Sequence, residues 1–475
     1  MATCVCWFHL DLRLTDHPAL DAAVASRDAV IPLYVLDDDA AGKWQPGGAS
    51  RWWLHHSLAS LAADLEALGS RLVLARGQAE EIIPRIMAAS GATTLHTHTR
   101  HEPWSRDQLG RVSSALEGRA RINTYTGTLL KSPGQVLSKT GNRMRVFTPF
   151  KRNLLAGEPP RPALPRPSRI PAPAAWPEGD SLDALDLLPS SKSGQQDWAT
   201  GMAAHWQVGE AAAHSAFDRF LDGTIDHYDT SRDLPSEIGT SRLSPHLHFG
   251  EISPVSIYHR VMERGLTNSG AEVFLSEIIW REFSHELLDQ FPFMPDAPLR
   301  NEFSRFPWRD DYADDLAAWQ AGRTGFPLVD AGMRELYSTG WMHNRVRMIT
   351  ASFLTKHLLI PWQEGERWFW DTLVDADLAS NSAGWQWVAG CGADASPYFR
   401  VFNPITQGDK FSAHDYVRRW VPEIAGRDDR GLFSPRDDGA GLFAASEDGT
   451  YPLPLVDHPT GRERALSAFQ RIKSA

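Results

Sequence analysis

The segment Trp341-Met-His-Asn-Arg-Val-Arg-Met348 carries the strongest structural signal in this chain, together with Asp375-Ala-Asp-Leu-Ala-Ser-Asn381-Ser-Ala-Gly-Trp385-Gln-Trp387 further along. On an α-helix, Trp341, Asn344 and Met348 fall at positions i, i+3 and i+7 and share one face. A simple core stripe would carry Leu, Ile and Val there. Two such segments predict helices that line a polar and aromatic pocket, although either segment alone also fits a core whose polar residues pair with one another.

The length of 475 residues predicts two or three domains, each with a substantial core. The chain has 18 Trp against 9 Tyr, an unusual excess of Trp, which indicates that the aromatic side chains serve a function. A net charge of −11 argues against a surface that is basic throughout, but one local basic groove remains possible. Three cysteines are too few for a disulfide framework, and no apolar run is long enough to cross a bilayer. We therefore expect a cytoplasmic monomer with reduced cysteines and no membrane segment.

The N-terminal part alternates between strand-like and helix-like runs. Such alternation predicts a parallel sheet covered by helices, an α/β arrangement of the Rossmann-like type. No G-x-G-x-x-G motif follows the first run, so the dinucleotide fingerprint is absent. The expected strands are Cys4–His9, Ala29–Leu36, Arg71–Ala75, Thr93–His98 and Arg121–Tyr125.

Three regions follow from these patterns. We expect the α/β domain over residues 1–130 and an extended connector over residues 131–205, where Glu158–Pro177 is rich in proline. An all-α domain should occupy residues 206–475, since the pattern there is helical and no strand-rich block occurs.

Two more groups in the helical region have residue types suited to binding. Tyr228-Asp-Thr-Ser-Arg232 and Thr240–Ser244 offer hydroxyls, backbone N–H groups and arginines for a phosphate or diphosphate, or they are plain helix caps. Glu277, Trp280 and Arg281 share a helical face, either as a pocket lining or as a surface ion pair beside a core indole.

The segment His96-Thr-His98-Thr-Arg-His101 invites comparison with metal sites, because alternate strand residues share a face. No carboxylate-rich or cysteine-rich ligand set accompanies it in the sequence. We therefore interpret these histidines as polar residues of the surface or of a pocket.

Taken together, these segments resemble the DNA photolyases and cryptochromes over almost the whole chain. The first strand and turn, Trp7-Phe-His-Leu-Asp11-Leu-Arg13-Leu-Thr-Asp16-His-Pro18, and the connector Val146-Phe-Thr-Pro-Phe-Lys-Arg152 are similar to that family. Trp280-Arg-Glu-Phe and the two opening segments are similar to its flavin-domain signatures. The resemblance implies an N-terminal antenna domain and a helical C-terminal domain that binds FAD beneath a cavity for the lesion.

The resemblance also implies roles for individual residues around FAD. Tyr228 and the Thr240–Ser244 segment should hold its diphosphate side, and Asn381 should face N5 of the flavin ring. Asn at that position is typical of repair photolyases in this family. The residues expected to bind FAD are Tyr228, Thr240, Ser241, Arg242, Leu243, Ser244, Arg281, Trp341, Asn344, Arg347, Asp375, Asp377 and Asn381.

A second set matches the lesion pocket of cyclobutane pyrimidine dimer photolyases. Met348 separates this class from photolyases of (6-4) products, whose pocket relies on histidines. Flipping a dimer is favoured because its bases already stack and pair poorly. The residues expected to act on the dimer are Glu277, Trp280, Asn344, Met348 and Trp387.

The partner implied by the resemblance is UV-damaged DNA. Trp385, Trp362 and Trp308 match the family's chain of indoles for photoreduction of the flavin, although each alone could be packing. Despite the acidic total charge, a local patch should contact DNA phosphates. Its candidates are Arg232, Arg345, Arg400 and Lys410, with Arg418 and Arg419 as further possibilities.

An antenna chromophore is the second cofactor that the resemblance implies. Trp104 and Ser105 stand where many photolyases have an acidic or amide pair, so a folate would stack on Trp104, near Lys43 and Trp44. The block Gly47–Leu54 resembles plant-type cryptochromes and the bacterial photolyases close to them. That likeness favours methenyltetrahydrofolate over a deazaflavin.

Two functions therefore compete for this chain. The favoured one is light-driven repair of cyclobutane pyrimidine dimers, with a preference for single-stranded DNA left open. The alternative is a blue-light signalling cryptochrome that binds FAD without repairing DNA. Asn381 and Met348 favour repair.

Overall fold

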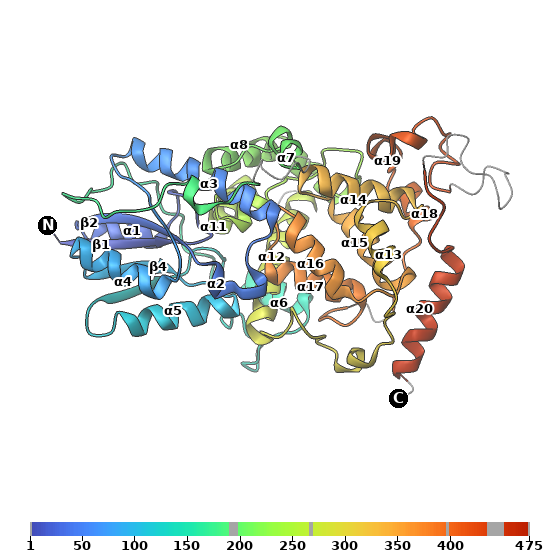
Figure 1. Ribbon diagram of the computed structural model, residues 1–475, viewed down its shortest axis with the longest axis horizontal. Coiled ribbons are helices and arrows are strands. Elements are labelled where there is room, and N and C mark those ends of the chain that lie inside the picture. Colours follow the sequence, from blue (N-terminus) through green and yellow to red (C-terminus); the bar gives the residue numbers. More distant parts are fainter. Residues whose placement is uncertain (1, 190–197, 266–268, 396–398, 435–450, 474–475) are drawn as a thin grey trace.

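The computed structural model describes residues 2–189, 198–265, 269–395, 399–434 and 451–473. Figure 1 shows an elongated molecule with the α/β part at one end and helices filling the other. This arrangement agrees with the α/β and all-α regions predicted from the sequence. None of the described helices is both long and apolar enough to cross a membrane.

The α/β part contains a five-stranded sheet in the order β3-β2-β1-β4-β5, and every paired strand is parallel. Central β1 and β2 are buried almost throughout because helices cover both faces. Residue His9, expected in β1, lies beyond it, since its backbone N–H turns to donate to Asp11 Oδ1 at 2.6 Å. The strands are β1 Thr3–Phe8, β2 Ala29–Leu36, β3 Val73–Arg76, β4 Thr94–His98 and β5 Arg121–Tyr125.

Side chains of β1 alternate between two cores, as the two-residue period of a strand requires. Cys4, Cys6 and Phe8 pack with α1 and α3, whereas Val5 and Trp7 pack with α4 and α5. The sheet is therefore sandwiched between two helical layers. The helices are α1 Pro18–Ala25, α3 Gly48–Ala67, α4 Ala79–Ser90 and α5 Pro103–Ala115, with a short α2 at Asp38–Ala41.

The segment predicted as an extended connector contains two helices, α6 (Phe147–Ala156) and α7 (Ala199–His205). Phe147 and Phe150 of α6 pack on Phe283 of the long helix α12. The expectation of an extended chain was therefore wrong for α6, whose apolar side is stabilised by tertiary contact. The proline-rich part between Glu158 and Pro177 has no helix or strand, as predicted.

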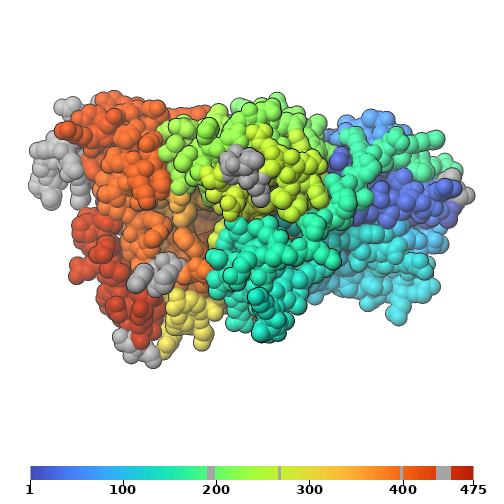
Figure 2. Space-filling view, turned by 180° about the vertical axis from the view of Figure 1, so that it is seen from behind, coloured from blue at the N-terminus to red at the C-terminus, as the bar shows by residue number. Residues whose placement is uncertain are grey.

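The helical part surrounds the long helix α12. Figure 2 shows a recess on one face, where the yellow-green segment containing α12 meets the teal segment containing α6 and the orange helices. The helices are α8 Glu210–Leu221, α9 Tyr228–Ser231, α10 Ser244–His248, α11 Pro254–Arg264, α12 Ser269–Gln290, α13 Ala313–Gln320, α14 Pro327–Thr339, α15 Asn344–Ser352, α16 Trp362–Thr372, α17 Leu378–Ala389, α18 Pro404–Lys410, α19 His414–Trp420 and α20 His458–Lys473.

One expectation about the opening segment is wrong. Trp341 does not share a helix with Asn344, because α14 ends at Thr339, is capped by Gly340 with a φ of +70°, and α15 begins only at Asn344. The Thr339 hydroxyl accepts a hydrogen bond from the Trp341 backbone N–H at 3.2 Å. The indole therefore lies in the turn between the two helices.

The turn after β1 attaches the α/β part to the helical part. The Leu12 N–H donates to the carbonyl of Phe249 at 3.0 Å, and the guanidinium of buried Arg13 donates to the carbonyl of Gly250 at 2.9 Å. Leu14 and its neighbour also donate backbone N–H bonds to the carboxylate of Glu210, the first at 2.7 Å. These bonds fix the relative position of the two parts.

Candidate functional site

A cavity of about 200 Å³ opens between α15, α16 and α17. Seven residues singled out in the sequence line it, so the structure brings together most of the two opening segments. These seven are Asn344, Arg347, Met348, Asp375, Asp377, Asn381 and Trp385.

Other residues of the lining were not predicted, although helical periodicity could have found some of them. Ala351 follows Asn344 by two turns of α15, and Gly384 and Val388 repeat the face of Asn381 on α17. Helical periodicity could not have predicted Phe369 of α16 or Leu373 after it, because neither lies on a helix with a predicted cavity residue. They line the cavity because α16 packs against α17.

An ion pair stands at one wall of this cavity. Arg347 Nη2 lies 2.8 Å from Asp375 Oδ2, and Arg347 Nε donates to the carbonyl of Met342 at 2.7 Å. The other carboxylate oxygen, Asp375 Oδ1, is buried and has no hydrogen-bond partner among the described residues. A buried acceptor without a donor is costly, so the cavity suits a ligand that brings an N–H or O–H group.

Asp377 is the N-cap of α17, and its side chain accepts from the N–H of Ser380 at 2.8 Å. Its second oxygen lies 3.3 Å from His285 Nε2 and 3.9 Å from His248 Nδ1. Burial alone would raise the pKa of this carboxyl, but His285 and His248 outweigh it and hold the pKa well below its usual range. Asp377 is therefore ionised beside the cavity.

The Asn381 side chain is held in place by a hydrogen bond to α16. Its amide Nδ2 donates to the backbone carbonyl of Glu366 at 3.0 Å, and the Ser382 hydroxyl donates to Glu366 Oε1 at 2.5 Å. Burial raises the pKa of Glu366 to about 8 despite the bond from Ser382. Glu366 thus holds a proton at neutral pH, and the sequence carried no signal for this role.

Predicted diphosphate-binding residues lie on the far side of Arg347. The guanidinium carbon of Arg242 lies 4.7 Å from the centre of the Trp341 ring, and that of Arg347 lies 5.9 Å from it. Ser244 begins α10, and Ser241 Oγ accepts from the Leu243 N–H at 3.4 Å.

Two predicted cofactor residues are not part of the lining of the 200 Å³ cavity. Tyr228 is buried with its ring edge-on to Phe220 and Phe274, each at 5.5 Å. Arg281 donates to the carbonyl of Thr128 at 2.8 Å, which connects α12 to the chain entering the connector. Their roles toward a ligand remain predictions.

The residues predicted to touch DNA meet near the start of α15. Arg232 forms an ion pair with Glu277, and Arg345 Nη2 lies 2.5 Å from Asp233 Oδ1. Arg345 and Lys410 both lie over the ring of Phe411, at 4.7 and 5.2 Å. Arg400 instead lies over Phe402, at 5.7 Å.

The Trp280 indole is stacked on the Phe147 ring, with 3.6 Å between centroids and 7° between planes. One face of the indole is therefore covered by α6, a contact that sequence analysis missed. Trp387 is partly buried on α17 but does not line the 200 Å³ cavity.

Of the three predicted electron-transfer indoles, Trp385 lines the cavity. Its ring contacts Phe369 at 5.0 Å and Trp319 at 6.2 Å, and Trp308 contacts Phe306 at 4.4 Å. Trp362 is buried in α16. Among the described residues the three indoles make no direct ring contact with one another, so any transfer would cross the gaps between them.

A second cavity, of about 120 Å³, lies where β1, β2 and β4 end. Strand order reverses between β1 and β4, and ligands of doubly wound sheets bind at such switch points. Trp44, Trp104 and Trp370 line it, together with Arg100 and Glu102. Lys43, expected nearby, lies 5.6 Å from the centre of the Trp44 ring and is also ion-paired with Asp296.

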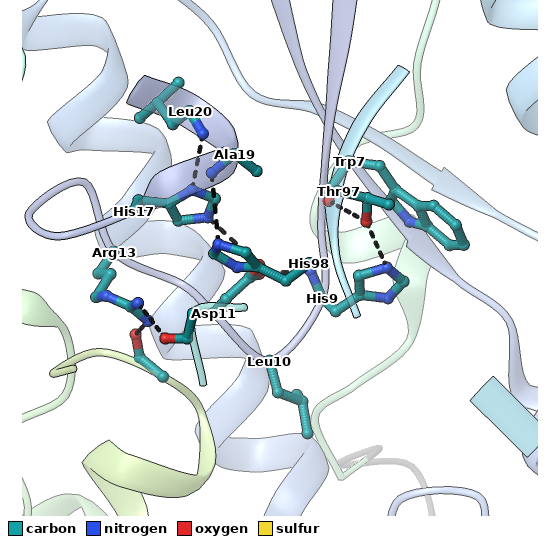
Figure 3. Close-up of polar contacts among 12 residues, drawn as sticks. Trp7, His9, Leu10, Asp11, Arg13, His17, Ala19, Leu20, Thr97 and His98 are labelled. Carbon is teal, nitrogen blue, oxygen red and sulfur yellow. Dashed lines mark hydrogen bonds and ion pairs between the residues drawn. The ribbon is translucent and has the colours of Figure 1, made fainter. Parts of the chain in front are cut away.

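The histidines of β4 are buried, so a surface position was wrong for them. Figure 3 shows Asp11 between His17 and His98, an arrangement that the sequence did not reveal. His17 Nδ1 accepts from the Leu20 N–H at 3.0 Å and His98 Nε2 from the Ala19 N–H at 3.4 Å. The remaining ring nitrogens therefore carry hydrogens and face Asp11, with His98 Nδ1 at 2.5 Å, so the cluster stabilises the turn and these two nitrogens offer no lone pair to a metal.

The raised pKa of Glu366 makes stability depend on pH. An unfolded glutamate has a pKa of 4.5, so the stability that comes from the bound proton is complete below pH 4.5 and is lost as the pH rises toward 8. Glu366→Gln keeps a neutral group at all pH values. We expect the melting temperature of the variant to rise relative to that of the wild type between pH 5 and pH 8, and the difference to stay constant above pH 8. The corresponding change in the free energy of unfolding is at most a few kcal/mol. A constant difference across this range, or the same trend in the exposed control Glu117→Gln, would contradict it.

Two family models match the chain, one described as "DNA photolyase" over residues 4–168 and one as "FAD binding domain of DNA photolyase" over residues 274–471. A deoxyribodipyrimidine photo-lyase of Agrobacterium fabrum is 44% identical across 99% of this chain and 98% of its own length. Cryptochrome-2 of Arabidopsis thaliana is 35% identical across 99% of this chain and 79% of its own length. The crystal structure of a bacterial class III photolyase from Agrobacterium tumefaciens matches with a TM-score of 0.93 and 44% identity, covering 100% of this chain and 98% of that one. This chain therefore belongs to the DNA photolyase and cryptochrome family.

Proposed function

We propose that the protein repairs cyclobutane pyrimidine dimers in DNA with light. The single observation that carries this proposal is the 200 Å³ cavity, where Asn381, Met348 and Asn344 stand beside the Arg347–Asp375 ion pair. When bound there, reduced FAD would supply the light-excited electron that splits the dimer and would take it back. The protein then needs no nucleophile or general base, and its residues bind, orient and exclude water.

The residues of the cavity fit the flavin. Asp375 Oδ1 is a buried acceptor without a partner, and the paired Arg347 keeps the charge of that carboxylate compensated. One N–H of the Asn381 amide is already used by the Glu366 carbonyl. The amide oxygen can accept a hydrogen bond, and an amide does not readily give up a proton, which favours a flavin that stays anionic after reduction.

Recognition of the dimer is assigned to the neighbouring wall. Trp280 has one ring face covered by Phe147, so only its other face can stack on a flipped base. Glu277 and Asn344 would read base edges by hydrogen bonds, and Met348 with Trp387 would complete the apolar surface. Extruding a dimer costs less than flipping paired bases, and this supports selectivity for damage.

A direct repair assay tests this function. The flavin-loaded protein is incubated with single- and double-stranded oligonucleotides that hold one thymine dimer, in blue light and in darkness, and restored thymines are counted. We expect repair only in light. Glu277→Ala should weaken dimer binding by about tenfold while the flavin absorbance stays unchanged. Bound flavin without repair would favour the signalling function of the cryptochrome relatives, and loss of flavin from the variant would place Glu277 in the cofactor site.

Electron supply to the flavin is the next proposal. Trp385 lines the cavity, so we assign it the first transfer, with Trp362 and Trp308 further out. Trp385→Phe should strongly slow the bleaching of oxidised flavin under blue light with a thiol reductant in solution. Trp420→Phe, on α19, serves as the control. Equal bleaching rates in the wild type and both variants would remove Trp385 from this role.

For the antenna we propose methenyltetrahydrofolate in the 120 Å³ cavity. Three indoles line this cavity, and Arg100 could pair with an anionic ligand. Ala376 and Leu378, which flank Asp377, also line it, so the two cavities are separated by one turn of chain. The proposed antenna domain is residues 1–130, joined through 131–205 to the flavin domain at 206–475.

Trp104→Ala tests the antenna. We expect the purified variant to lose its extractable second chromophore and to keep FAD, because a stacking surface is removed. Chromophores are released by acid and identified by mass spectrometry, with Trp176→Ala as the control. A full folate content in Trp104→Ala, or a deazaflavin in the wild type, would refute the proposal.

A further inference from the structure

We propose that Asp233 restrains the DNA-binding arginines of the free protein and thereby lowers its affinity for undamaged DNA. The inference rests on the proposed function in one respect, that Arg232 and Arg345 contact DNA phosphates. Asp233 was not singled out in the sequence, and it takes no part in the proposed chemistry.

The contacts of Asp233 join two arginines. Its Oδ1 atom lies 2.5 Å from Arg345 Nη2 and 4.0 Å from Arg232 Nε. Arg232 is also ion-paired with Glu277, so two carboxylates and two guanidiniums form a chain. The chain runs from the start of α15 to the middle of α12, along the wall assigned to the dimer.

The four side chains are only partly exposed. Asp233 and Glu277 keep 33% and 32% of their side-chain surface in solvent, and Arg232 and Arg345 keep 18% and 21%. Pairs at this depth are screened less than fully exposed ones. The arginines also pack on rings, Arg232 over Tyr228 at 5.4 Å and Arg345 over Phe411 at 4.7 Å, which limits where their guanidiniums can move.

A carboxylate and a phosphate compete for the same guanidinium. Both offer anionic oxygens that accept two parallel N–H bonds, and Arg345 cannot give the same N–H groups to both. A phosphate that takes the N–H bond of Arg345 Nη2 must therefore displace Asp233 from that atom. This displacement removes part of the favourable free energy that each phosphate contact would add.

Damaged DNA makes a compensating contact that undamaged DNA cannot make. When a phosphate draws Arg232 away, Glu277 is released from its ion pair and can accept hydrogen bonds from a base edge. Only a flipped dimer brings such an edge to Glu277. The chain of ion pairs thus couples the phosphate contacts to reading of the lesion, and it fits a protein whose net charge is −11.

Asp233→Asn tests the inference, since it keeps the shape of the side chain and removes its charge. Binding is measured in darkness by fluorescence anisotropy, with matched duplexes that contain one thymine dimer or none. We expect affinity for the undamaged duplex to rise about three- to tenfold, with a smaller rise for the damaged duplex. The slope of log affinity against log salt should steepen by up to about one unit, because an extra arginine releases a counterion.

Asp64→Asn is the matched control. Asp64 pairs with Arg166 at 2.8 Å on α3 of the N-terminal part, so this variant changes the net charge equally and breaks an ion pair far from Arg345. Asp233→Ser checks that the effect follows charge rather than the amide. Unchanged melting temperatures and flavin absorbance confirm that the variants fold.

Two results would overturn the inference. One is an Asp233→Asn affinity for undamaged DNA no higher than that of Asp64→Asn, and the other is a loss of affinity for both duplexes, which would mean that Asp233 positions the arginines for binding. Failure of the proposed function shows differently, as a wild type that does not prefer the dimer. The affinity for the undamaged duplex tests the role of Asp233 whether or not the wild type prefers the dimer.

Discussion

The fixed relation between the two parts of the molecule depends on the guanidinium of Arg13, which is almost wholly buried. It donates to the carbonyl of Gly127 at 2.6 Å, to that of Asp16 at 2.8 Å and to that of Gly250 at 2.9 Å. Three acceptors from three segments would be left without donors if this side chain were absent, and that is costly in a buried interface. Because Gly250 belongs to the helical part, the turn after β1 cannot move independently of it. The 120 Å³ cavity lies at this junction, so its distance from the 200 Å³ cavity is set by the same bonds.

The buried carboxylates of the 200 Å³ cavity are stabilised by neighbouring side chains rather than by solvent. Asp375 is compensated by Arg347 and Asp377 by two histidines, while Glu366 forms no ion pair within the described part of the chain and keeps its proton. A carboxylate survives burial only when a partner offsets the loss of hydration. The cavity therefore has fixed charges before any cofactor or DNA binds, and this preorganisation suits a reaction in which the protein stabilises charge without exchanging protons. The ion pairs around Asp233 differ from these, because their side chains are partly exposed.

Local patterns predicted much of this molecule. The alternation of apolar runs indicated five parallel strands, and each was found within a few residues of its expected place. Helical spacing placed Asn344 and Met348 on one face, and both line the same cavity, together with Arg347. Errors occurred where a cap or a turn interrupts the period, as at Trp341, and where an apparently polar connector forms a helix, as at α6. In both cases tertiary hydrogen bonds or packing overrode the local signal.

The pairing of residues from distant segments lay beyond those patterns. Phe147 stacks on Trp280, Glu366 anchors Asn381, and Asp11 joins His17 to His98, yet no local pattern in the sequence connects these partners. Periodicity states which face of a helix or strand a side chain occupies, since that depends only on backbone geometry. It does not state what faces that side chain, because this depends on how helices from the whole chain pack together. The residue types and their faces could thus be read from the chain alone, whereas charge state, orientation and partner were decided only when the chain folded and brought those faces into contact.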